Sequence, residues 1–166
     1  MKPDIQTPAP SHEIITVQAS QDRELCYCVR IEVFHHEQKF PLDTEIDEYE
    51  DIATHFLLRL TPSLDPVGTI RVQALDAQHY KLSRLAVLKE YRRFNFGKEL
   101  VDALHDWVRA AATQASQTGS VQIITHSQIP VKGFYARLDF TFWGDEFDED
   151  GAPHQKMILY LHLDNN

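Results

Sequence analysis

Residues 85–98 read LAVLKEYRRFNFGK, and this stretch decides the fold that we predict. Its apolar start closes a strand expected over 79–88, and an amphipathic helix begins near Gly97, so a short loop joins a strand end to a helix N-terminus. The first N–H groups of a helix have no partner inside the helix and lie at the positive end of its dipole. Such a junction is suited to binding a pyrophosphate.

The composition of this loop supports the prediction of a phosphate cradle. Asn95 and Gly97 tolerate the backbone conformations that a close approach to a ligand requires. Arg92, Arg93 and Lys98 add positive charge to a chain whose formal net charge is −9. The residues alone leave a second interpretation open, an exposed helix start with charged neighbours.

The sequence on either side of the cradle predicts a mixed sheet. Apolar runs over 55–60, 67–75 and 79–88 are separated by short turns, which favours an antiparallel meander. After the cradle the period changes to that of an amphipathic helix, with apolar residues at Leu100, Val101, Leu104, Trp107, Val108 and Ala111.

The outer segments complete the prediction of an α+β protein with a single domain over 13–166. The first 12 residues contain three prolines among polar neighbours and are expected to form a flexible tail. The remaining expected elements are a strand over 13–18, a helix over 22–38 with Ser20 as its N-cap, strands over 121–125, 141–143 and 157–163, and a short helix over 134–138.

Charge and hydropathy exclude some classes of function. An acidic chain without a basic stripe is a poor binder of nucleic acid, and the sequence lacks the ~20 apolar residues of a membrane helix. We therefore expect a soluble cytoplasmic protein. Acidic residues cluster within 43–51 and again within 145–150. These clusters are interpreted either as solvated loops or as a mouth that attracts a cationic substrate.

The strand-to-helix junction resembles the signature Q/R-x-x-G-x-G/A of the GNAT N-acetyltransferase superfamily. Arg92, Asn95 and Gly97 occupy its three marked positions, and residues 85–87 match the Leu-Ala-Val strand end that usually precedes it. Asn95 departs from the usual glycine, although asparagine also tolerates the left-handed conformation.

Similarity to the ElaA-like group of this superfamily extends over nearly the whole chain after residue 12. It is carried by residues 30–51, by the Gln128 and Phe134-Tyr135 pattern within 128–140, and by the segment 147–154. The resemblance implies the GNAT fold: a mixed, mostly antiparallel sheet with six to seven strands, flanked by about four helices, with a V-shaped splay between the fourth and fifth strands.

The resemblance also implies acetyl-CoA as co-substrate and acetyl transfer to a primary amine in a ternary complex. No metal is expected, because the adjacent His35 and His36 would point to different faces of a helix. The acceptor would be a small amine, or a lysine or N-terminal amine of a peptide, and a homodimer is compatible with the family. Tyr135 matches the family's general acid. The expected cofactor-binding residues are Leu85, Ala86, Val87, Arg92, Arg93, Phe94, Asn95, Phe96, Gly97, Lys98 and Gln128.

The general base is not fixed by the sequence. Glu37 is favoured because it lies in the Glu-Gln pair before the first acidic cluster, while His55, His126 and a chain of water molecules are alternatives. A primary amine has an ordinary pKa near 10.4, so some group must take its proton before attack. Because no base is evident, a non-catalytic acyl-CoA-binding or sensing domain remains the alternative function.

Overall fold

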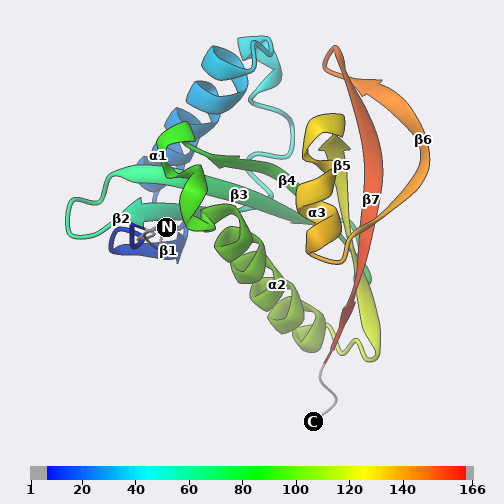
Figure 1. Cartoon of the computed structure of the whole chain (residues 1–166). Helices are drawn as coiled ribbons and strands as arrows, with labels where there is room; N and C mark the ends of the chain where they lie inside the picture. Colours follow the sequence, from blue (N-terminus) through cyan, green and yellow to red (C-terminus); the bar gives the residue numbers. More distant parts are fainter. Residues whose placement is uncertain (1–6, 164–166) are drawn as a thin grey trace, which may run out of the picture.

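A computed structural model describes residues 7–163 as one seven-stranded sheet (Figure 1). All neighbouring strands are antiparallel except β4 and β5, which are parallel, so the predicted mixed sheet is confirmed. In sheet order the strands are β1 (His12–Thr16), β2 (Thr54–Leu60), β3 (Pro66–Ala74), β4 (His79–Val87), β5 (Ser120–Gln128), β7 (Ala152–His162) and β6 (Thr141–Glu149).

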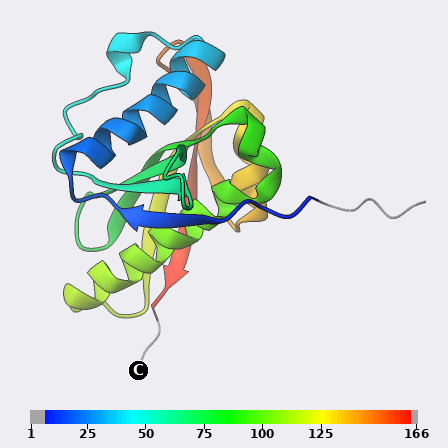
Figure 2. The same cartoon turned by 90° about the vertical axis from the view of Figure 1, so that its left-hand side faces the viewer.

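Three α-helices accompany the sheet: α1 (Ser20–Arg30), α2 (Phe96–Gln114) and α3 (Lys132–Arg137). Figure 2 shows the sheet lying between α1 and α2. Shorter turns of helix are η1 (Ile31–Glu37, a π-helix), η2 (Leu42–Thr44), η3 (Lys89–Phe94) and η4 (Ile129–Val131). None of the helices within 7–163 is long and apolar enough to cross a membrane.

The core lies between α2 and the central strands because α2 has the amphipathic pattern that the sequence predicts. Its apolar side chains are buried against β2, β3 and β4, and fully burying one leucine contributes ~1.5–3 kcal/mol. Gly68 in β3 permits this close packing, since a Cβ there would lie 3.0 Å from Cδ1 of Leu100. The residues of α2 that are buried are Phe96, Leu100, Val101, Leu104, Val108 and Ala112.

Several boundaries differ from the sequence prediction. The helix expected over 22–38 is α1 followed by the π-helix η1, and Ser20 is its first residue rather than its cap, since Ala19 is the N-cap without a side-chain hydrogen bond. Strand β1 begins at His12, inside the expected tail, and residues 1–6 of that tail lie outside the described residues.

The last hairpin is much longer than expected, since only 141–143 and 157–163 were predicted as strands. In the structure β6 runs to Glu149 and β7 starts at Ala152. Its acidic residues obscured the strand because exposed charges interrupt the apolar alternation by which a strand is recognised. The turn of this hairpin and the loop 38–53 lie at the same end of the sheet (Figure 1), and Glu149 lines the same cavity as residues of that loop.

Strands β4 and β5 separate in the way that the family resemblance implies. Their pairing is limited to His79–Leu82 of β4 and Gln122–Thr125 of β5. Just beyond this point Arg84 has a φ of 53°, and the register between β3 and β4 shifts at the same place. Because β5 no longer pairs with β4 beyond Leu82, the edge of β4 over 83–87 that faces β5 has no strand partner.

Candidate active site

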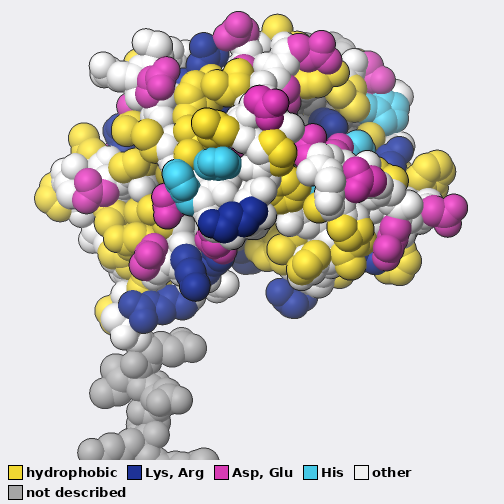
Figure 3. All heavy atoms as spheres, turned by 90° about the horizontal axis from the view of Figure 1, so that it is seen from above, with side chains coloured by type: hydrophobic (Ala, Val, Ile, Leu, Met, Phe, Trp, Pro, Cys, Tyr) yellow, Lys and Arg dark blue, Asp and Glu magenta, His cyan; other side chains and the backbone are white. Residues whose placement is uncertain are grey.

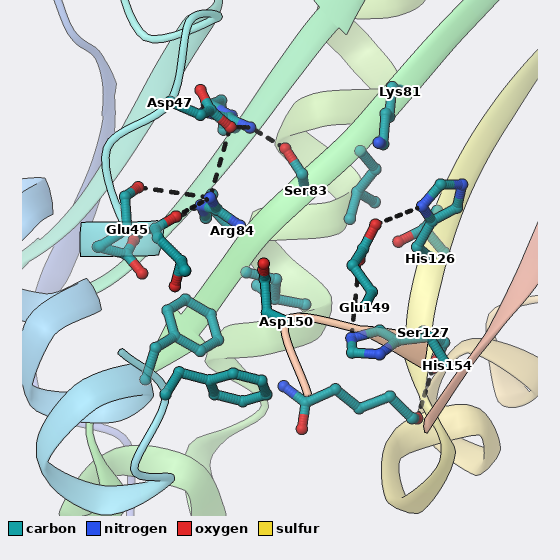
Figure 4. Close-up of a pocket in the computed structure, with 18 of the residues that line it drawn as sticks. Glu45, Asp47, Lys81, Ser83, Arg84, His126, Ser127, Glu149, Asp150 and His154 are labelled. Carbon is teal, nitrogen blue, oxygen red and sulfur yellow. Dashed lines mark hydrogen bonds and ion pairs between the residues drawn. The ribbon is translucent and has the colours of Figure 1, made fainter. Parts of the chain in front are cut away.

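A cavity of about 450 Å³ opens where β4 and β5 separate (Figure 4). Its walls come from β4, from the end of β5, from the loop 38–53, and from the turn between β6 and β7. Among the residues that line it, Leu85, Gln128 and Tyr135 belong to the site expected from the sequence. The cavity therefore combines an open strand edge with a tyrosine.

The cradle has the backbone conformation that the sequence predicts. Asn95 has a φ of 62° and is the N-cap of α2, and its side chain makes no capping hydrogen bond. The first hydrogen bond of the helix runs from the Glu99 amide to the Asn95 carbonyl. The amides of residues 96–98 precede that bond and remain available to an anion. The Phe96 side chain is buried in the core, so only its backbone can serve a ligand.

The three cations of the cradle differ in how they are engaged. Arg92 donates through Nε to the Val87 carbonyl at 3.0 Å and through both terminal nitrogens to Glu37 at 2.6 Å. Lys98 pairs with Asp102 at 2.7 Å. Arg93 lies over the ring of Phe94 and has no acidic partner among residues 7–163.

The N-terminal segment passes beside the cradle. His12 binds Glu99 in the first turn of α2 at 2.9 Å, and this contact holds the preceding residues close to the helix start. A shallow hollow between them is lined by Thr7–Ala9 on one side and Arg93–Asn95 on the other. Figure 3 shows Lys and Arg side chains gathered near the first described residues of this segment. Positive charge is therefore concentrated at the cradle of an acidic protein.

Strand β4 presents the remaining cofactor candidates, Leu85, Ala86 and Val87. Ala86 and Val87 pair with β3 on one side, and their side chains are buried. Leu85 is half-buried and faces the cavity. Their backbone groups on the β5 side have no strand partner. An extended ligand can add to such an edge as another strand would.

Tyr135 is buried in α3 and lines the cavity from the core side. Its ring packs edge-on against Phe134 and Phe140. Burial raises the pKa of the Tyr135 phenol to about 12, and the Thr125 side chain offsets part of this effect. The phenol therefore keeps its proton at neutral pH.

Gln128 lies at the end of β5 and also lines the cavity. Its side-chain amide donates to the Gln38 side chain at 2.9 Å. Glu37 and Gln38 are consecutive residues at the end of η1, and each binds a residue expected to contact the cofactor.

The structure brings only one of the three candidate bases into the cavity. Glu37 pairs with Arg92 away from the cavity lining, and that hydrogen bond lowers the pKa of the Glu37 carboxyl. His55 is buried, donates to the Glu50 carbonyl, and has its pKa lowered by burial. His126 follows Thr125, the last residue of β5 that pairs with β4, and it lines the cavity.

The acidic loop is held by arginines rather than left free. Arg30 is fully buried and donates to Glu45 and Glu50. Arg71 donates to both oxygens of Asp47, at 2.8 and 2.9 Å, and to Glu50 at 2.7 Å. Burial alone would raise the pKa values of Asp47 and Glu50, but the hydrogen bonds and the positive charge of the arginines together outweigh it, so both pKa values are lowered.

The end of the β6–β7 hairpin contributes functional candidates that the sequence analysis missed. Glu149 lies between His126, at 2.9 Å, and His154, at 3.7 Å, and all three line the cavity (Figure 4). The signal in the sequence is a glutamate and a histidine inside the family-like segment 147–154, to which the resemblance assigns no catalytic role. Within the part of the chain that the structure describes, no group of three or more His, Cys, Asp or Glu residues is arranged to hold a metal ion.

Comparison with known proteins identifies the family of this chain. A family model described as an acetyltransferase (GNAT) domain matches residues 16–161. The chain belongs to the GNAT acetyltransferase family. It is 32% identical over 146 residues to the uncharacterized N-acetyltransferase YjcF of Bacillus subtilis, covering 87% of this chain and 96% of YjcF.

Solved structures of GNAT proteins share the architecture. A crystal structure from Lactobacillus plantarum superposes with a TM-score of 0.78 at 28% identity and covers 91% of this chain and 99% of that one. Escherichia coli ElaA gives a TM-score of 0.70 at 19% identity, with 89% and 97% covered, and so shows the shared fold. The expectation of a GNAT fold is confirmed.

Proposed function

We propose that this GNAT protein is an acetyl-CoA-dependent N-acetyltransferase that acts on a primary amine by direct attack in a ternary complex. The observation that carries the proposal is the convergence of three features at one splay: the unpaired edge of β4 over 83–87, the free amides of residues 96–98, and a cavity with a protonated Tyr135. Each feature matches one part of the reaction.

The residues present fit acetyl-CoA. Backbone groups of Leu85–Val87 would hold the pantetheine arm, the cradle of residues 92–98 would hold the pyrophosphate, and Gln128 would border the arm after releasing Gln38. When bound, acetyl-CoA supplies an activated acetyl thioester, from which amide formation releases a thiol. Arg92 connects η1 to the end of β4 through its hydrogen bonds to Glu37 and Val87. Arg93 has no acidic partner among the described residues and would bind the phosphate groups.

Tyr135 is proposed as the general acid. Its phenol oxygen holds a proton at neutral pH, because its pKa is about 12, and can donate it to the sulfur that leaves. Phe134 and Phe140 fix the ring by packing on it, so the hydroxyl is oriented before substrate arrives. A sensing domain that only binds acyl-CoA would need the cradle but not a proton donor in the adjoining cavity.

The acceptor is proposed to be a small amine or a peptide amine, with preference for a cationic molecule. The cavity is lined by five carboxylates, but Glu45 and Asp47 are paired with arginines. Asp43 and Asp150 have no ion-pair partner among the described residues. A second positive charge on the acceptor would be attracted to these two side chains.

Calorimetric binding of acetyl-CoA to three proteins tests the cofactor part of the proposal. Asn95→Val places a β-branched residue at a φ of 62°, which costs on the order of 1–2 kcal/mol, so we expect affinity to fall about tenfold. Asn95→Gly accepts that φ without strain and should bind like the wild type. Undetectable binding by the wild type would contradict the proposed function. Equal affinity of the wild type and both Asn95 variants would show that the cradle does not contribute to cofactor binding.

A further inference from the structure

The wall of the cavity opposite the acidic loop holds a chain of three ionisable side chains. His126 comes from β5, Glu149 from the end of β6, and His154 from the start of β7. Figure 4 shows Glu149 between the two imidazole rings. Three adjacent strands thus place one carboxylate against two histidines at the splay.

Hydrogen bonding fixes which nitrogen of each ring carries the proton. A carboxylate only accepts, so His126 donates through Nδ1 to Glu149 at 2.9 Å, and in the neutral ring Nε2 carries the lone pair. A backbone carbonyl also only accepts, so His154 donates through Nδ1 to the Ala152 oxygen at 2.8 Å. The His154 Nε2 then faces the second oxygen of Glu149 at 3.7 Å.

His126 is the more accessible of the two rings. Its side chain is 28% exposed, against 7% for His154. Its Nε2 has no hydrogen-bond partner among residues 7–163, while its Nδ1 donates a hydrogen bond to Glu149. A carboxylate behind an imidazole with a free lone pair is the arrangement by which proteins orient a general base.

We propose that His126 is the general base for the acceptor amine and that Glu149 is its positioning residue. This proposal rests on the proposed acetyltransferase function. One N–H bond of the acceptor ammonium breaks, the proton passes to Nε2 of His126 directly or through one water molecule, and the electron pair stays on the amine nitrogen for attack. The imidazolium that forms is stabilised by the Glu149 carboxylate, whose second oxygen lies 3.7 Å from Nε2 of His154.

Charged groups on every neighbouring strand act on this pair. Lys81 on β4 faces Glu149 and helps to lower the pKa of its carboxyl, after the larger effect of the His126 hydrogen bond. Lys156 lies opposite His126 on β7, but its ammonium is directed over the Trp143 ring. Asp150 lines the same cavity. The carboxylate of Glu149 therefore stays ionised and available to His126.

Steady-state kinetics of thiol release against pH test the assignment, with His126→Gln and His126→Asn as variants. General base catalysis contributes typically 10²–10⁴-fold, so we expect kcat/KM for the amine to fall by about that factor at neutral pH. The loss should shrink as the pH approaches the ordinary amine pKa of about 10.4, because the amine then arrives already neutral. The KM for acetyl-CoA should not change.

Two further variants separate catalysis from structure. Glu149→Gln removes the negative charge beside His126, so the imidazolium is less stable and the acidic limb of the pH profile should move to lower pH. His162→Ala removes an exposed histidine at the other end of β7 and should leave the profile unchanged.

The possible outcomes distinguish this proposal from the function on which it rests. Wild-type turnover with an unchanged profile in the folded His126 variants would overturn the base assignment alone. An unmoved acidic limb in Glu149→Gln would overturn the positioning role. Absence of thiol release by the wild type with every amine would overturn the acetyltransferase function itself.

Discussion

Two acidic segments of this protein look alike in sequence and differ in the structure. The first, within 43–51, folds against Arg30, Arg71 and Arg84. These three arginines pair with Glu45, Asp47 and Glu50, which are three of its six carboxylates. The second, within 145–150, lies on the edge strand β6 and its turn, where only Glu149 has ionisable partners within the described chain, the histidines His126 and His154. Acidic composition therefore does not tell which carboxylates are available to a substrate.

The difference arises from partners that are distant in sequence. Arg30 lies in α1 and Arg71 in β3, and the fold closes the loop 38–53 over both of them. Within residues 7–163 no cation forms an ion pair with Asp145 or Glu146, and both side chains are exposed. We expect substitutions in the first segment to affect stability and substitutions at the cavity end of the second to affect catalysis.

The largest effect is expected from Arg30→Ala. It leaves the buried carboxylates of Glu45 and Glu50 without their cation, which should lower the free energy of unfolding by ~3–5 kcal/mol. Urea denaturation measures the change. Arg109→Ala, which breaks an exposed pair with Asp106, is the matched control and should cost less than ~1 kcal/mol. Equal effects of the two variants would contradict the buried network.

A pair of identical substitutions compares the segments directly. Asp47→Asn removes the carboxylate that accepts two hydrogen bonds from Arg71, so the free energy of unfolding should fall by about 1–3 kcal/mol. Asp145→Asn changes an exposed side chain and should stay within about 0.5 kcal/mol. If denaturant midpoints of the two variants coincide, the contrast between the segments is wrong.

The pH dependence of stability should report the same network. Folding lowers the pKa of Glu50 below its ordinary value of 4.5. Its contribution is therefore complete above pH 4.5 and is lost as the pH falls through the lowered pKa of the folded state. Thermal unfolding of Glu50→Gln between pH 7 and pH 3 should show a lower midpoint at pH 7 and a shallower loss in acid. An unchanged slope would show that Glu50 titrates alike in both states.

The smallest effect is expected at the cavity mouth. Asp150→Asn should raise the KM of a dicationic amine severalfold at low salt and leave a monocationic amine unaffected, since an exposed charge pair contributes only ~0.2–1 kcal/mol. Glu48→Gln removes an equally exposed acid that lies outside the cavity lining and should change neither KM. The same response in both variants would mean that net charge, rather than position, attracts the acceptor.

The fold could be predicted from local patterns, while much of the site could not. Alternation gave the central strands, a helical period gave α2, and Asn95 marked the cradle because its side chain tolerates a positive φ. Pairings between distant residues leave no such local trace. Glu37 meets Arg92 across 55 positions, and His126 meets Glu149 across 23, so the sequence favoured a base that the structure places outside the cavity.

Thiol release from acetyl-CoA over a panel of mono- and dicationic amines, with wild type and Tyr135→Phe, tests the central claim most directly. We predict stoichiometric thiol and amide with at least one amine, a loss of about 10²-fold or more in kcat for Tyr135→Phe, and unchanged acetyl-CoA affinity. Acetyl-CoA binding without thiol release from any amine would contradict the enzyme and indicate a sensing domain. Full activity of Tyr135→Phe would contradict its role as general acid.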